Sequence, residues 1–240
     1  MIAAVASITL RALFNRRRTV LLLLLGALLV LISVLFRLGD PGEAESTEVT
    51  RRLLADFGIA VLLPLVAVII GTSALGSEIE DGTIVYLLAK PVPRSWIVLI
   101  KLVVAWLVTV ALVAPALGVA GLIGGDGQLA AAHAVAAVVG ALEYTAIFIA
   151  LSLVTSRALI AGLAYVVVWE GVVAGLFSGT RILSVRQHVL AVAEALGGPG
   201  AADSAELALG VALAMAAVAT VAAVTLAIRR LATVELRGET

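Results

Sequence analysis

Two carboxylates stand inside otherwise apolar stretches of this sequence. Glu143 lies near the middle of an apolar run from about 131 to 154, and Glu170 lies in the next run, from about 158 to 178. A charged carboxylate at that depth in a membrane costs at least about 2.5–3.5 kcal/mol, so each should face protein or a water-filled cavity. Both are candidates for the translocation pathway, where they would contact a polar or cationic substrate or carry a proton. The alternative is a protonated or hydrogen-bonded carboxyl that bridges helices.

A second concentration of polar residues forms an insert between two apolar runs. Its acidic cluster consists of Glu78, Glu80 and Asp81. Asp81 or Thr83 can cap a short helix after Gly82, and Pro91 and Pro93 would end that helix. The apolar residues on one face of this helix are Ile84, Val85, Leu87 and Leu88. The pattern predicts a short amphipathic helix held between two membrane spans.

The composition excludes several classes of function. The chain has 240 residues, of which 62% are hydrophobic, and its formal net charge is zero. It is therefore expected to be an integral membrane protein that does not bind nucleic acid. There is no cysteine, and His133 and His188 stand alone, so we expect no metal site and no catalytic residue. No Walker-type phosphate-binding string is present, so the chain itself is not expected to hydrolyse ATP.

Hydropathy predicts an all-α polytopic membrane fold in a single domain, 1–240. The six expected spans are about 19–37, 57–77, 96–124, 131–154, 158–178 and 205–228. The sequence predicts an amphipathic helix in the membrane interface at 1–18 and a short helix in an acidic loop at 47–54. A further interfacial helix is expected within 179–204, outside the membrane.

Small residues recur in the fifth span. Gly171 and Gly175 form a small-x-x-x-small pair, which permits close approach of helices within a membrane. They are candidate contacts between two copies of the chain. The alternative is packing inside one protomer.

The distribution of basic residues predicts the orientation. With the amino terminus inside, the inner segments hold eleven of the sixteen Lys and Arg residues and the outer loops hold five. The inner residues are Arg11, Arg16, Arg17, Arg18, Lys90, Arg94, Lys101, Arg157, Arg229, Arg230 and Arg237. The positive-inside rule therefore places both termini and the polar insert on the cytosolic side of the cell membrane.

The residue order of the insert resembles the type-2 class of ABC exporter permeases. The resemblance rests on Glu-x-Glu-x-Gly-Thr, a Leu-Leu pair, Pro-Val-Pro-Arg, and Lys101 early in the next span. It implies that Glu78 through Arg94 form a coupling helix that docks on a separate ATP-hydrolysing subunit. The residues that would make this contact are Glu78, Glu80, Asp81, Gly82, Thr83, Leu87, Leu88, Pro91 and Arg94.

The resemblance also implies an assembly. Two permease chains, identical or similar, would pair with two cytosolic ATPase subunits that bind ATP and magnesium, and this chain would bind no cofactor. The expected function is therefore half of the translocation pathway of an ATP-driven exporter. One alternative is a proton- or ion-coupled secondary transporter or channel that uses Glu143 and Glu170. Another is a membrane anchor or signalling partner that transports nothing.

Overall fold

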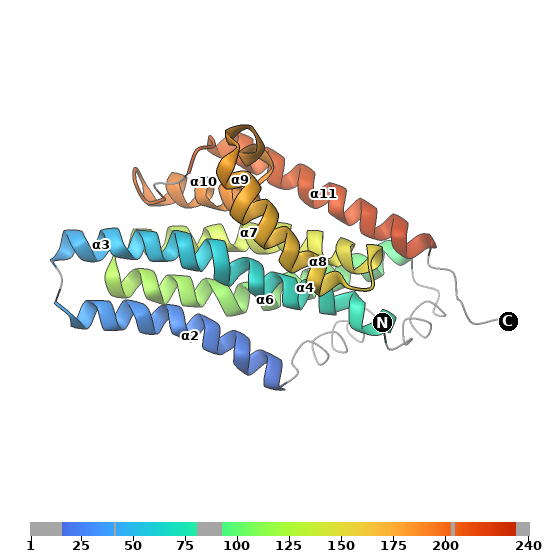
Figure 1. Cartoon of the computed structure of the whole chain (residues 1–240), viewed down its shortest axis with the longest axis horizontal. Helices are drawn as coiled ribbons and strands as arrows, with labels where there is room; N and C mark the ends of the chain where they lie inside the picture. Colours follow the sequence, from blue (N-terminus) through green and yellow to red (C-terminus); the bar gives the residue numbers. More distant parts are fainter. Residues whose placement is uncertain (1–15, 41, 81–92, 203–204, 234–240) are drawn as a thin grey trace.

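The computed structural model describes residues 16–40, 42–80, 93–202 and 205–233, and within them the chain is helical (Figure 1). The elements are α2 (Arg16–Leu38), α3 (Glu43–Arg52), η1 (Leu53–Leu62), α4 (Leu63–Glu80), α6 (Arg94–Gly124), α7 (Gly127–Val154), α8 (Ala158–Ala164), η2 (Tyr165–Val173), α9 (Ala174–Leu176), η3 (Ser178–Leu183), α10 (Val185–Gly197) and α11 (Leu209–Thr233).

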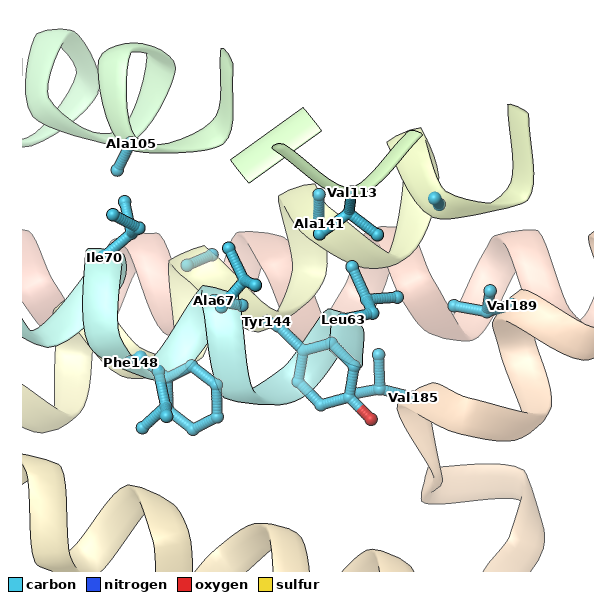
Figure 2. Close-up of a cluster of buried hydrophobic side chains, with 14 of the residues drawn as sticks. Leu63, Ala67, Ile70, Ala105, Val113, Ala141, Tyr144, Phe148, Val185 and Val189 are labelled. Carbon is cyan, nitrogen blue, oxygen red and sulfur yellow. The ribbon is translucent and has the colours of Figure 1, made fainter. Parts of the chain in front are cut away.

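Helix α7 is the centre of the bundle and packs against α4, α6, α10 and α11. Small residues on α7 allow this crowding. A Cβ atom on Gly140 would lie 2.3 Å from Val189 of α10 and 2.8 Å from Leu63 of α4, so only glycine lets both neighbours approach. Figure 2 shows Leu63 in this cluster between Ala141 of α7 and Val189 of α10. The composition of α7 thus sets the spacing of the core.

Six helical segments of the described chain are long and apolar enough to cross a membrane. Three are largely buried in the protomer: Glu43–Gly76, Arg94–Gly124 and Gly127–Val154. The other three expose most of their apolar surface: Thr19–Leu38, Ala158–Leu176 and Leu209–Thr233. Such exposed apolar surface is stable only against lipid or another membrane helix. The predicted all-α, six-span membrane fold is therefore confirmed.

The second span differs from the expectation in one respect. The short helix expected at 47–54 is not separate, because α3, η1 and α4 follow one another without interruption from Glu43 to Glu80. The chain continues as π-helix through η1, and Pro64, which has no backbone N–H, lies inside this continuous helix just after the π-helical stretch. The acidic loop helix is thus an extension of the span.

The ends of the chain and the insert are described only in part. The expected interfacial helix at 1–18 lies almost wholly outside the described residues, and so does the insert from 81 to 92. Within 179–204 the structure contains α10, which packs on α7 and α11. The position of this helix relative to the membrane stays a prediction.

Candidate functional site

Only some of the coupling residues expected from the sequence lie within the residues that the structure describes. Asp81, Gly82, Thr83, Leu87, Leu88 and Pro91 lie outside the described residues, and Glu80 is the last residue of α4. Glu78 and Arg94 flank the insert and are described. Their contacts show how the two ends of the insert are attached to the bundle.

The end of α4 is joined to α6 by a buried ion pair. The Nζ atom of Lys101 donates to Oε1 of Glu78 at 2.7 Å and to the backbone oxygen of Ala74 at 2.7 Å. Ala74 and Glu78 are one turn apart, so both acceptors lie on one face of α4. The Lys101 side chain is 1% exposed and that of Glu78 is 17% exposed. A buried ammonium requires such partners, because its desolvation is costly.

The other end of the insert is attached to α11. Arg94 is the first residue of α6, and its Nη1 atom donates to the backbone oxygens of Leu231, at 2.8 Å, and Ala232. Leu231 and Ala232 lie in the last turn of α11, where carbonyl oxygens have no partner within the helix. A cation is favoured there by the helix dipole. Arg94 therefore ties the start of α6 to the carboxyl end of the last span.

Glu143 is paired with His188, which stands alone in the sequence. Nδ1 of His188, in α10, lies 3.0 and 3.1 Å from the two carboxylate oxygens of Glu143, and both side chains are 1% exposed. Nε2 of His188 lies 2.9 Å from the backbone oxygen of Ile182, which can only accept, so Nε2 carries a hydrogen. A second proton must lie between Nδ1 and the carboxylate. Glu143 thus shares a proton with α10 in the protein interior.

Outside the candidate spans, the pKa of His188 is perturbed by these neighbours. Burial by itself lowers the pKa of the imidazole, but the hydrogen bond to Glu143 and the charge of that carboxylate outweigh it. The pKa of His188 therefore lies above its ordinary value of 6.5. The protonated imidazole stabilises the contact between α7 and α10.

Glu170 binds the amino terminus of α10. Its carboxylate accepts hydrogen bonds from the hydroxyl of Ser184, from the backbone N–H of Val185 at 2.9 Å and from the hydroxyl of Tyr165 at 3.2 Å. A longer contact, 3.4 Å, comes from the N–H of Arg186. An anion is favoured at a helix amino terminus, where N–H groups are free and the dipole is positive. Glu170 therefore acts as a remote cap for α10.

Each of the two π-helical stretches contributes a carboxylate that contacts the amino-terminal end of α10. Asp56 lies in η1 and accepts from the guanidinium of Arg186 at 2.8 Å, while Glu170 lies in η2. A cavity of about 170 Å³ adjoins Glu170 and is lined by Glu170, Ala174, Gly175, Arg181, Ser184, Arg186, Gln187 and Glu206. The wide turns of two different spans thus present carboxylates to one helix end.

These contacts bear on the two readings of the intramembrane carboxylates. Glu143 is bonded to His188 of α10, Glu170 is bonded to Tyr165, Ser184 and Val185, and both carboxylate side chains are buried. The arrangement favours the structural alternative, in which they bridge helices. His133 and His188, taken from the sequence to be separate from any cluster, are also buried, and His188 is a member of this one.

Gly171 and Gly175 lie on the outside of the protomer. A Cβ atom added to Gly175 would meet nothing within 4 Å, and one on Gly171 would meet only the backbone oxygen of Val166, at 3.7 Å. Both residues are exposed, together with Val168, Val172 and Leu176 on the same helix face. This arrangement is against the alternative in which the two glycines pack inside one protomer.

Comparison with known proteins gives the family. A search of the curated proteins found no match. A family model described as ABC-2 family transporter protein matches residues 14–179, which is more than half of the chain. The matched region runs from the first span through the insert and its two anchors to the exposed glycines of the fifth span. With this match, and with six helices in the described residues that are long and apolar enough to cross a membrane, the chain belongs to the ABC-2 transporter family and is a membrane permease.

Proposed function

We propose that this permease is one half of the translocation pathway of an ATP-driven exporter. The observation that carries the proposal is the attachment of the insert: Lys101 holds its first end and Arg94 its second. A segment fixed to the bundle at both ends can pass on the motion of a partner docked on it. ATP and magnesium would bind to that partner, a cytosolic ATPase subunit, since the chain has no Walker-type string.

The orientation and assembly form part of the same proposal. The excess of basic residues on the side of the insert supports a cytosolic position for the insert and both termini, in the cytoplasmic membrane. The open surface over Gly175 supports the pairing of two permease chains, and two ATPase subunits would complete the complex. The contact between the permeases would then include the exposed face of the fifth span.

The alternative of an ion-coupled carrier receives less support. A relay carboxylate needs access to water on each side of the membrane in turn. Glu143 is 1% exposed and hydrogen-bonded to His188, and Glu170 is 5% exposed with three short hydrogen bonds. Both residues hold α10 against the bundle through these hydrogen bonds, so we do not assign them to an ion path.

The test is purification of the permease with its native partners. The carboxyl terminus is tagged, membranes are solubilised in mild detergent, and ATP hydrolysis by the complex is measured. We expect a soluble Walker-motif protein to co-purify and hydrolyse ATP. A variant with Glu80→Ala and Asp81→Ala should recover less of it. If no ATPase co-purifies after crosslinking, and transport follows an ion gradient, the proposed function is wrong.

A further inference from the structure

The buried ion pair at the base of the insert has a role that a docking contact would not explain. Lys101 is 0% exposed as a residue, so it cannot touch a partner subunit on the surface. It lies seven residues inside α6, which corresponds to about 10 Å along the axis. Burying an ammonium so deep in an apolar helix costs free energy, so we expect Lys101 to have a function there.

Lys101 links the two helices on either side of the insert, because it belongs to α6, which follows the insert, and binds α4, which precedes it. Its two acceptors, Ala74 and Glu78, belong to the last two turns of α4, and the undescribed insert begins at residue 81. Next to the ion pair the contact between α4 and α6 is apolar, with Ile70 facing Ala105 (Figure 2). Apolar surfaces of this kind can slide, whereas a buried charged hydrogen bond is directional and stronger than one in water.

We propose that Lys101 is a positioning residue that transmits movement of the insert to α6. The inference rests on the proposed function, because the movement originates in an ATPase docked on the insert. This reassigns Glu78: the resemblance names it as a docking residue, whereas here its carboxylate, bonded to Lys101, belongs to the ion pair. The docking contact is then made by the other residues that the resemblance names. Displacement of the end of α4 then displaces α6, which packs against α2, α4 and α7.

A doubly neutral variant separates transmission from folding. Loss of Glu78 alone would leave the buried Lys101 ammonium without its carboxylate, which is strongly destabilising, whereas replacement of both partners is often tolerated. The test variant is therefore Glu78→Gln with Lys101→Met. The matched control neutralises the exposed pair Glu48–Arg52, whose side chains are 38% and 73% exposed, as Glu48→Gln with Arg52→Met. The rescue variant exchanges the charges, as Glu78→Lys with Lys101→Glu.

The readout is a fluorophore attached to α6. The natural chain has no cysteine, so Val103→Cys, at a 46% exposed position two residues from Lys101, gives a single labelling site in the permease. Complexes are purified with an ATPase subunit whose cysteines are replaced by serine. The quantities measured are the amount of ATPase bound and the change of emission on adding ATP.

We expect all variants to bind the ATPase subunit in the same amount. The neutral pair should lose at least about fivefold of the ATP-dependent emission change, the lower bound of typical coupling between sites. The surface control should respond like the natural protein, and the exchanged pair should recover the response. If the neutral pair does not fold, the exchanged pair decides alone: recovery supports the inference and an absent response overturns it.

Three other outcomes would overturn the inference, and they are distinguishable. A neutral pair that binds the ATPase and responds fully leaves the proposed function standing but excludes transmission through Lys101. A neutral pair that loses the ATPase shows that the ion pair shapes the docking surface instead. If the natural protein neither binds an ATPase nor responds to ATP, the proposed function is wrong and the inference is wrong with it.

Discussion

Replacing Glu170 by alanine should loosen α10 from the bundle. Three donors lie within 3.2 Å of the carboxylate, namely the hydroxyls of Ser184 and Tyr165 and the N–H of Val185. A buried donor left without a partner costs about 1–3 kcal/mol, which gives an upper range of about 3–9 kcal/mol. Two effects reduce this sum. Water from the adjoining 170 Å³ cavity can replace part of the carboxylate, and a buried charge is removed.

We therefore expect Glu170→Ala to lower the free energy of unfolding by about 2–3 kcal/mol. For a chain of this size that corresponds to a fall of about 4–12 °C in the midpoint of thermal unfolding. Because the lost contacts belong to the start of α10, amide hydrogen exchange should rise most at 185–189, before the rest of the bundle opens.

The control lies in the same cavity. Glu206 is 48% exposed in its side chain and pairs with Arg181, so Glu206→Ala should cost less than about 1 kcal/mol. The measurements are thermal unfolding in detergent and hydrogen exchange by mass spectrometry. If Glu170→Ala and Glu206→Ala gave the same midpoint and the same exchange in α10, the carboxylate would not be holding the helix, and the reasoning would be refuted.

Three further predictions concern other parts of the protein. Because the pKa of His188 is raised above 6.5, its stabilising charge is present below that pH and is lost as pH rises through the raised value. The midpoint of thermal unfolding should fall as pH rises through the pKa of His188, and His188→Gln should remove this pH dependence. Gly175→Leu should lower the dimer fraction measured by light scattering in detergent, and an unaltered fraction would exclude this face as the contact. Gly121→Ala places a Cβ 2.7 Å from the backbone of α7 and should cost about 1–3 kcal/mol of unfolding free energy, whereas Gly127→Ala meets nothing within 4 Å and should cost far less.

The spans could be predicted from the sequence, whereas the interactions among the polar residues could not. A run of apolar residues identifies a span by its length and composition, which are local properties. The partner of a buried charge depends on tertiary packing. Lys101 and Glu78 are 23 residues apart, and Glu143 and His188 are 45 apart. A signal did exist: one lysine within an apolar helix requires an acceptor, and acidic residues end the preceding span.

The π-helical stretches were beyond sequence reasoning for a different reason. The residues of η1 and η2 are ordinary formers of α-helix in a membrane, and nothing in their composition demands wider turns. The wider turns are instead associated with long-range contacts: Asp56 binds Arg186, and Glu170 binds the start of α10. The carboxylate of the fifth span could therefore be located from the sequence, but not the helix end that it caps.

Three of the buried ionisable residues, Lys101, Glu143 and Glu170, fall into two groups, and the division has a functional consequence. Glu143 and Glu170 join the fourth and fifth spans to α10, whereas Lys101 joins α4 to α6 next to the insert. Changes in the first group should alter the attachment of α10 and leave the surface of the insert intact. Changes at Lys101 act on α4 and α6, the two helices through which the proposed ATPase partner would move the bundle. An intramembrane charge in this permease is therefore interpreted best by the helices that it connects, and its depth in the membrane alone does not place it on a transport path.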